Sequence, residues 1–448
     1  MLDIKYIREN VERVRQAAAA KRVACDLDQL IAVDARRRAV QLELEALRTA
    51  SREGGQQIAL YRNPKSEWYK RAIASGMTTE QIAGEAKRTQ EELNQVKSAI
   101  KSLEEQDKVV NQEFDALMLT VAQPADDDVP AGKDESENVE LRREGGVRRF
   151  DFEPKDHVAL GAALDIIDIE RGVRLAGSRN YVLKGDGALL HRAVLQLALD
   201  LMVERGFVPM HVPVLVREET MTGTGYFPAG RDQAYLCERD ELSLVGTAEV
   251  PLTAYHTGEI LSEKDLPLKY CAVSPCFRRE AGAAGKDTAG LYRIHLFDKV
   301  EQVIICRNDE ELSKQFHQEI LRNAEDVLRA LELPYRVVNV CTGDLGQGQV
   351  QKFDIETWMP SRNSYGETHS ASRFYEFQAR RLMLRYRDEQ KKIHYCHTLN
   401  NTVIASPRIL IPLLELHQNA DGSVTIPGKL RPYMNGRERI ASGRLVRP

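Results

Sequence analysis

Two stretches in the first part of the chain repeat their apolar residues in alternating steps of three and four. The first stretch begins at Asp26 and carries Leu30, Val33, Val40, Leu44 and Leu47, with Arg37 at one position of the repeat. The second carries Leu93, Val96, Ile100, Leu103, Val110, Phe114 and Leu117, with Asp107 interrupting it. Such steps place side chains on one narrow stripe of an α-helix. The pattern therefore predicts two helices that zip together as an antiparallel hairpin.

The turn of this hairpin is predicted within residues 51–76, which contain Gly54, Gly55, Pro64 and Gly76. Glycine and proline interrupt helices because one costs backbone entropy and the other lacks an N–H donor. Residues 61–79 have no regular pattern, and we expect them to cap the far end of the hairpin.

Periodicity alone does not assign a role to the hairpin. A dimerisation rod or a spacer explains the apolar repeat as well as a nucleic-acid-binding arm does. The hairpin also carries the basic residues Arg36, Arg38, Arg62, Lys65, Lys70, Arg71, Lys87 and Arg88. These favour phosphate contact slightly, although helix surfaces are often charged only to stay solvated.

The pattern changes after a boundary at residues 123–138, where prolines and an acidic cluster replace the apolar repeat. Beyond it, β-rich runs occur at 208–216, 270–273, 299–306 and 335–340, and longer helical patterns at 189–205 and 310–331. Strands that are not separated by regular helices favour an α+β domain around an antiparallel sheet. We therefore predict a helical arm over residues 1–125, a linker over 126–138 and a second domain over 139–448.

Composition narrows the class of protein. A chain of 448 residues usually divides into two domains. The net charge of −4 gives no global basic footprint, so any RNA contact must come from local patches. Seven cysteines without a C-x-x-C pair argue against a zinc ribbon and fit a reducing cytoplasm. We expect neither a signal peptide nor a membrane span, because the start is charged and apolar runs are short.

Residues 275–301 are the first of several segments that suggest chemistry. Phe277-Arg278-Arg279-Glu280 follows a predicted strand, a glycine- and alanine-rich loop comes next, and a second strand carries Phe297 and Glu301. Two strands joined by such a loop can present Arg278 to a phosphate and Phe297 to a flat base on one face. Arginine suits phosphate because its planar fork donates two hydrogen bonds. An ordinary salt-bridged hairpin is the alternative for any one of these residues.

Residues 353–381 are the second such segment, and Glu356, Glu367, His369, Ser370 and Ser372 lie close together within it. Carboxylate and hydroxyl oxygens are hard ligands that suit Mg²⁺ bound with a nucleotide. A polar surface loop explains this segment equally well. The lone histidine has no second histidine or cysteine at ligand spacing, so no chemical role is predicted for it.

Two shorter elements complete the set. Residues 398–418 begin as a strand, turn at Ser406-Pro407 and continue as an apolar helix, with Arg408 expected in its first turn. Anions are favoured at such a helix N-terminus. Thr247 and Glu249 are two residues apart on a predicted extended strand, where they point to one face and suit a small polar amino acid. The sequence has no GxxxxGK[ST] phosphate loop, no Rossmann fingerprint and no G-x-S-x-G motif.

The ordered combination of these segments resembles the seryl-tRNA synthetases over nearly the whole chain. The helix-strand stretch 195–214 is similar to class II motif 1, with Pro213 as its proline. CFRREAG running to RIHLFDKVEQ resembles motif 2, and TLNNTVIASPRIL resembles motif 3. GTAE, ETHSAS followed by FQARR, the ending PGKLRPYMNG and the opening MLDIKYIREN are also similar to the family. The resemblance implies a coiled-coil arm in front of a class II domain whose antiparallel sheet is flanked by helices.

The resemblance also implies roles for individual residues. The serine-binding positions are Thr247, Ala248, Glu249, Arg278, Glu301 and Thr402. The ATP-binding positions are Arg278, Arg279, Glu280, Ile294, Phe297, Glu367, Thr368, His369, Ser370 and Arg408. Arg278 and Arg408 are the implied catalytic arginines, and Glu367 and Ser370 the implied Mg²⁺ ligands. The implied partners are ATP with Mg²⁺ and no zinc, serine, tRNA(Ser), tRNA(Sec) where present, and a second copy of the chain in a cytoplasmic homodimer.

Two features depart from the family pattern. Ala371 stands where the family commonly has a cysteine, and the arm tip at residues 57–85 looks longer and more irregular than is usual. A family member that no longer charges tRNA would be expected to have lost charged residues in its motifs, which are all present here. A relative that passes the aminoacyl group to a carrier protein would be expected to lack the arm.

Overall fold

The computed structural model describes residues 1–282 and 290–442, and it divides into two compact units. The smaller unit is Ala24–Val121. The larger unit contains Met1–Val23 together with the chain from Ala122 onward. Residues 1–23, which we predicted as part of the arm, therefore pack with the second domain.

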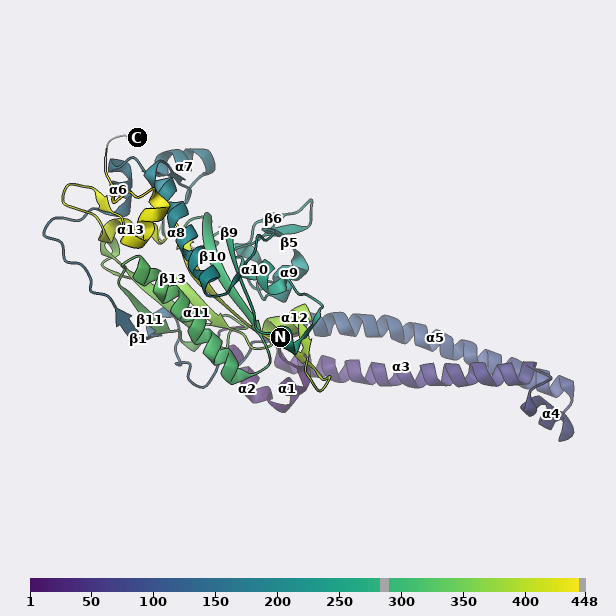
Figure 1. Cartoon of the computed structure of the whole chain (residues 1–448). Coiled ribbons are helices and arrows are strands. Elements are labelled where there is room, and N and C mark those ends of the chain that lie inside the picture. Colours follow the sequence, from purple (N-terminus) through teal and green to yellow (C-terminus); the bar gives the residue numbers. More distant parts are fainter. Residues whose placement is uncertain (283–289, 443–448) are drawn as a thin grey trace. The chain divides into compact units, whose positions relative to one another are not determined.

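The smaller unit is a hairpin of two long helices, α3 (Leu27–Arg62) and α5 (Thr79–Met118), which lie side by side (Figure 1). Its buried residues include Leu30, Val33, Leu44, Leu93, Leu103 and Phe114, all on the predicted repeat. Arg37 fits into this apolar stripe because its guanidinium lies 3.9 Å from the centre of the Phe114 ring. The cation interacts with the ring face there. The predicted helical hairpin is confirmed.

The turn of the hairpin is shorter than we predicted. Gly54 and Gly55 lie inside α3, which continues to Arg62. A glycine inside a helix costs about 1 kcal/mol, which packing against a partner helix offsets. A third helix, α4 (Glu67–Ala74), occupies the segment that we expected to be irregular. The Ser66 hydroxyl accepts a hydrogen bond from the Tyr69 amide and begins this helix, as N-capping serines do.

The larger unit is built on an eight-stranded sheet in the order β1-β11-β12-β13-β16-β10-β9-β4. Its strands are β1 (Val139–Glu144), β4 (Val208–Pro209), β9 (Leu268–Phe277), β10 (Leu296–Cys306), β11 (Tyr335–Asn339), β12 (Gln351–Met359), β13 (Ser364–Arg373) and β16 (His397–Ser406). Every neighbouring pair is antiparallel except β4 with β9. The predicted α+β class with an antiparallel sheet is confirmed.

Two long helices, α8 (Asp186–Glu204) and α11 (Glu310–Ala330), pack on this sheet (Figure 1). The remaining helices of this unit are α1 (Ile4–Glu9), α2 (Val11–Ala20), α6 (His157–Ala163), α7 (Ile169–Ala176), α9 (Glu218–Gly223), α10 (Glu249–Ala254), α12 (Phe377–Leu382) and α13 (Leu410–Leu416). Short strands form smaller sheets: β2 (Ile167–Asp168), β3 (Val182–Leu183), β5 (Leu215–Arg217), β6 (Leu236–Cys237), β7 (Leu242–Leu244), β8 (Ile260–Ser262), β14 (Arg385–Arg387), β15 (Ile393–Tyr395), β17 (Val424–Thr425) and β18 (Arg439–Ile440). In the part of the chain that the structure describes, no helix combines the length and apolarity that crossing a bilayer requires.

The predicted linker is fastened to the larger unit along its length. The amide of Asp126 donates to the Val350 carbonyl at 2.9 Å, and the Gly343 amide donates to the Gly132 carbonyl at 3.0 Å. Gly343 must be a glycine, because a Cβ there would lie 2.2 Å from the carbonyl oxygen of Lys133. Residues 126–138 are therefore part of the domain surface and not a free connection.

Candidate active site

The β9–β10 pair brings an arginine and an aromatic ring together. Phe297 on β10 lies opposite Cys276 on β9, and Arg278 follows the end of β9 directly. The Arg278 guanidinium lies 5.1 Å from the centre of the Phe297 ring, and its Nε donates to the Gly246 carbonyl at 3.4 Å. Part of the loop that connects the strands, residues 283–289, lies outside the described residues. The two side chains form a wall that can face a phosphate and a flat base.

One pocket unites this wall with the other predicted segments. It is lined by Arg278, Glu280, Leu291, Tyr292, Ile294, Phe297, Lys299, Glu367, Thr368, Thr402, Ala405 and Arg408. Eight of these twelve residues belong to the site predicted from sequence. They come from the segment between β9 and β10, from β10, β13 and β16, and from the turn after β16. These strands are central neighbours in the sheet. Segments more than a hundred residues apart in the sequence therefore meet over one part of the sheet.

Arg408 lies just before α13, which begins at Leu410, so the prediction that it belongs to the first turn of this helix was wrong. Neighbouring segments hold the side chain in the pocket instead. Its Nε donates to the Tyr292 carbonyl at 3.2 Å, and its Nη1 donates to the Glu367 carbonyl at 3.1 Å. The guanidinium also lies 4.5 Å from the centre of the Tyr292 ring. The pocket therefore has two fixed arginines, Arg278 and Arg408.

Thr247 and Glu249 are not on a strand, as we predicted, because Glu249 begins the short helix α10. They still act together, since the Thr247 hydroxyl accepts a hydrogen bond from the Glu249 amide at 3.1 Å. The same hydroxyl donates to the Glu301 carboxylate at 3.4 Å. Ala248, between them, is fully buried. The start of a helix, and not a strand, therefore brings Thr247 and Glu249 together.

Glu249 and Glu301 are two buried carboxylates whose charges repel each other. The Glu249 carboxylate accepts hydrogen bonds from the Tyr226 hydroxyl at 2.7 Å and from the Gln378 amide at 2.8 Å. Burial, and then the negative charge of Glu301, raise the pKa of Glu249 to about 7. Burial also raises the pKa of Glu301, although the Lys299 ammonium opposes the shift. A cationic ligand would relieve both effects, because it supplies the missing positive charge.

Lys299 was not predicted as a site residue, but it lines the pocket and forms a buried ion pair with Glu301. Its Nζ also donates to the Thr402 hydroxyl at 3.4 Å. Alternation along β10 places Phe297, Lys299 and Glu301 on one face of the strand. A lysine between two predicted site residues at this spacing was the signal that could have identified it. Tyr226 and Gln378 had no such signal, because they reach Glu249 from distant segments.

Three predicted ATP-binding residues lie outside the lining of the pocket. Arg279 is directed toward the Asp232 carbonyl, 3.4 Å from its Nη1. His369 is buried with its Nδ1 2.8 Å from the Thr368 hydroxyl, and burial lowers its pKa to about 4. Ser370 lies opposite Asp354 in the β12–β13 register. His369 is therefore packed against Thr368, beside a residue that lines the pocket.

The pocket offers few donors for a metal ion by itself. Among residues 1–282 and 290–442, no group of three His, Cys, Asp or Glu side chains is arranged to hold one. The half-exposed Glu367 carboxylate lies 4.0 Å from Arg408, at the edge of the pocket. Mg²⁺ prefers a few carboxylates together with substrate phosphates and water. This donor set therefore fits a Mg²⁺ ion that arrives with a nucleotide.

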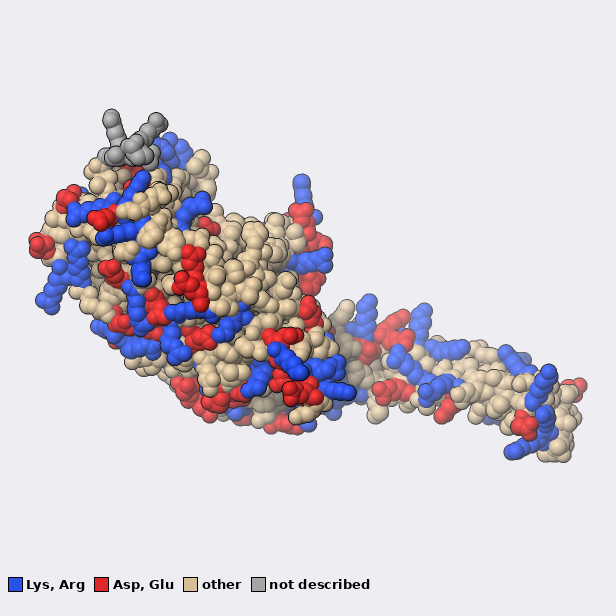
Figure 2. All heavy atoms as spheres, in the orientation of Figure 1, with Lys and Arg blue, Asp and Glu red and all other residues tan. Residues whose placement is uncertain are grey.

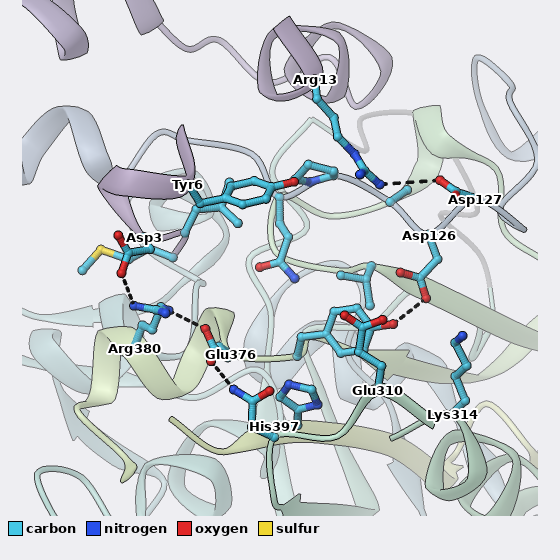
Figure 3. A pocket seen from close by; sticks show the side chains of 18 of the residues that line it. Asp3, Tyr6, Arg13, Asp126, Asp127, Glu310, Lys314, Glu376, Arg380 and His397 are labelled. Atoms are coloured by element: carbon cyan, nitrogen blue, oxygen red, sulfur yellow. Dashed lines mark hydrogen bonds and ion pairs between the residues drawn. The ribbon is translucent and has the colours of Figure 1, made fainter. Parts of the chain in front are cut away.

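A larger cavity, of about 720 Å³, lies between the first helices and the sheet domain (Figure 3). Several of its charged side chains form ion pairs. Asp3 pairs with Arg380 at 3.2 Å, Arg13 with Asp127 at 3.5 Å, and Asp126 with the buried Arg373. The pairs of Asp3 with Arg380 and of Arg13 with Asp127 join the N-terminal segment to the rest of the larger unit.

Comparison with known proteins identifies the class and then the family. Residues 235–417 match the model of the tRNA synthetase class II core domain (G, H, P, S and T). An antiparallel sheet whose pocket holds two arginines and an aromatic ring agrees with this class of enzyme. Residues 1–123 match the model of the seryl-tRNA synthetase N-terminal domain. The chain belongs to the seryl-tRNA synthetase family and is an enzyme of this family, an ATP-dependent serine–tRNA ligase.

The relatives cover the chain from end to end. The serine–tRNA ligase of Deinococcus radiodurans is 47% identical, over 98% of both chains, and that of Fervidobacterium nodosum is 42% identical, over 97% of this chain and 98% of its own. The crystal structure of seryl-tRNA synthetase from Pyrococcus horikoshii complexed with ATP is 35% identical. It has a TM-score of 0.87 and covers 99% of this chain and 100% of its own.

Proposed function

We propose that the chain activates serine with ATP and transfers the seryl group to tRNA(Ser), and to tRNA(Sec) where that tRNA is present. The observation that carries the proposal is the convergence of Arg278, Phe297 and Arg408 in one pocket. The buried carboxylates Glu301 and Glu249 lie next to this pocket, since Glu301 pairs with the lining residue Lys299 and Thr247 links Glu301 to Glu249. The arginines supply positive charge for a triphosphate, and the carboxylates supply negative charge for an ammonium group. A small amino acid and a nucleotide together satisfy both halves of the site.

Serine binds with its ammonium group near Glu249 and its hydroxyl near Glu301 and Thr402. Thr247 connects the two halves of this subsite, because it contacts both carboxylate-bearing residues. Lys299 holds Glu301 in place through their ion pair. A site with this many polar groups around a hydroxyl rejects analogues that lack it, because the groups would be left unpaired.

ATP binds with its adenine ring against Phe297 and between the backbone segments of Glu280 and Ile294. Arg278 contacts the α-phosphate, and Arg408 contacts the far end of the triphosphate. Glu367 and Ser370 would hold the Mg²⁺ ion that accompanies the nucleotide, and the ion would neutralise phosphate charge. The arginine forks suit phosphate oxygens because each donates two hydrogen bonds in a fixed geometry.

The reaction has two steps. The serine carboxylate attacks the α-phosphorus, the bond to the leaving pyrophosphate breaks, and seryl-adenylate forms. A terminal ribose hydroxyl of the tRNA then attacks the acyl carbon, and AMP leaves. Positioning and charge neutralisation by Arg278 and Arg408 provide the catalysis of the first step. The first step requires no side-chain base, because the attacking carboxylate is already ionised.

The test compares two neighbouring arginines. Arg278→Ala should lower serine-dependent ATP–pyrophosphate exchange by about 10²–10³-fold, by analogy with the loss of one charge-stabilising donor. Arg279→Ala is the matched control, because Arg279 is directed toward the Asp232 carbonyl outside the pocket, and it should stay within about threefold of the parent protein. Near-normal exchange by Arg278→Ala would refute the role given to this residue.

The hairpin is the proposed tRNA-binding arm, and the family model that matches residues 1–123 supports this. We also propose a cytoplasmic homodimer, because motif 1 is the dimer interface in this class of enzyme. In this chain motif 1 includes part of α8 and strand β4, where the side chains of Val203 and Val208 are 46% and 55% exposed. Sedimentation of the purified chain tests the dimer, and a monomer at micromolar concentration would exclude it.

The second candidate function is a family member that transfers the seryl group to a carrier protein or charges nothing. The retained hairpin and the complete set of charged pocket residues argue against it. Charging of serine tRNA by the purified chain, compared with transfer to a carrier protein, separates the two functions.

A further inference from the structure

A groove of about 540 Å³ lies at the end of the hairpin where α3 passes through α4 into α5. It is lined by Tyr61, Arg62, Pro64, Tyr69, Thr79, Ile82, Ala83, Ala86, Lys87, Gln90 and Glu91. The Tyr61 ring is supported from one side by Trp68, with 4.4 Å between ring centres. Tyr61 and Tyr69 are only half-buried. The groove thus combines partly open aromatic rings with polar and basic side chains.

The segment that connects α3 to α5 is basic, although the acidic Glu91 also lines the groove. Residues 61–79 carry Arg62, Lys65, Lys70 and Arg71 against the single acid Glu67. Within the hairpin, all of which the structure describes, no ion pair joins Arg62, Lys65, Arg71 or Lys87 to a carboxylate. Arg62 instead donates to the uncharged Gln90 side chain at 3.2 Å. Figure 2 shows Lys and Arg side chains gathered over this end of the hairpin.

Closing the hairpin does not require this composition. Ala72 on α4 and Ile82 on α5 are already buried where these helices touch, and serine and threonine caps begin the two helices. A segment that only joined two helices would gain nothing from unpaired cations beside half-open rings. Single-stranded nucleic acid needs this combination, because its bases stack on aromatic faces and its phosphates attract cations. Double-stranded RNA does not, since its base faces are hidden.

We propose that this groove, formed by Tyr61, Tyr69 and Lys87, is a stacking site for an unpaired nucleotide of the bound tRNA. Tyr69 and Tyr61 contact the base, and Lys87 and Arg62 contact the adjoining phosphates. The inference rests on the proposed role of the hairpin as a tRNA arm. It adds a contact to an exposed loop of the tRNA at the part of the arm that departs most from the family pattern.

Tyr69 tests the stacking contact in the full-length protein. Tyr69→Ala should raise the Kd for a tRNA(Ser) transcript by about tenfold, because stacking on one aromatic side chain contributes on the order of this much. Tyr69→Phe keeps the ring and should bind within about twofold of the parent protein. Serine-dependent pyrophosphate exchange should be unchanged in both variants, because Tyr69 belongs to the other compact unit.

Lys87 and Arg88 form a matched pair that tests the phosphate contact and does not disturb α4. Lys87 lines the groove without an ion pair, whereas Arg88 pairs with Glu92 at 3.2 Å and does not line it. Lys87→Gln should weaken tRNA binding and lower the slope of log Kd against log salt by about 0.7, as expected for one phosphate of a single strand. Arg88→Gln should leave that slope as it is.

The outcomes separate this inference from the proposed function. If the parent protein charges tRNA and both Tyr69→Ala and Lys87→Gln bind it with parental affinity, the groove does not contact RNA. Chemical footprinting gives a second reading, since the parent protein should protect unpaired nucleotides that Tyr69→Ala leaves reactive. Protection confined to paired nucleotides would overturn the inference. If the parent protein binds no tRNA, both the proposed role of the arm and the inference about the groove are wrong.

Discussion

At the scale of single residues, the amino-acid pocket depends on carboxylates that the protein has made difficult to ionise. Glu249 is 6% exposed, and the negative charge of the nearby Glu301 raises its pKa. Its pKa of about 7 places the change of charge within the range in which enzymes are commonly assayed. Sequence alone could nominate this residue as a partner for an ammonium group, but only burial and the second carboxylate determine when it is charged.

The affinity for serine should therefore depend on pH. Below pH 7 the Glu249 carboxyl is protonated and attracts an ammonium group less, so the KM for serine should rise as pH falls from 8 to 6. The raised pKa gives this sign, because the charged form exists only above about 7. The KM for ATP should change less. Pyrophosphate exchange measured from pH 6 to pH 8 gives both KM values. A KM for serine that does not change with pH would contradict the prediction.

At the scale of secondary-structure elements, β10 provides one face of the active site. Its alternation puts Phe297, Lys299 and Glu301 together, and its pairing with β16 brings Thr402 opposite Glu301. The predicted strands 270–273 and 299–306 lie within β9 and β10, so their existence was accessible from sequence. The predicted run 208–216 instead divides into β4 and β5, which belong to different sheets. The apolar pattern of a short segment does not determine which neighbouring strand it pairs with.

Replacing Lys299 should lower the free energy of unfolding, because it leaves the buried Glu301 carboxylate on β10 without a cationic partner. Lys299→Met keeps much of the side-chain volume but leaves Glu301 without its ion pair, and such losses cost about 3–5 kcal/mol. The loss of unfolding free energy should be smaller at pH 5 than at pH 8, because a protonated Glu301 needs no cationic partner. Denaturant unfolding at the two pH values measures this difference. An equal loss at both would show that Lys299 acts through packing alone.

At the scale of the whole molecule, the family domain and the compact unit have different boundaries. The match to the N-terminal family model covers residues 1–123, whereas the hairpin that packs by itself is 24–121. The first 23 residues belong to the larger unit. Lys21 is buried there, and its ammonium donates to the carbonyls of Gly346 and Gln347 at 3.3 and 3.4 Å. Deletions of the arm should therefore spare these residues.

Deleting residues 26–114 should separate the two reactions. Adenylate formation should persist, because every residue of the pocket lies in the larger unit. Charging of tRNA(Ser) should be lost if the arm supplies the contacts with phosphate and shape that RNA recognition requires. Pyrophosphate exchange and aminoacylation of one preparation measure both steps. A deletion protein that still charges tRNA at the parental rate would disprove the role of the arm.

The sequence by itself determined the helical hairpin, the α+β class and the ordered motifs, because an apolar repeat or a short motif is a local property of the chain. Tertiary structure decided where those motifs act. It placed Glu249 at a helix start, held Arg408 by the Tyr292 and Glu367 carbonyls, and buried Lys299 against Glu301. Each of these results depends on strands and helices that meet across long stretches of sequence. Burial and neighbouring charge, which set the chemistry of the site, exist only after that meeting.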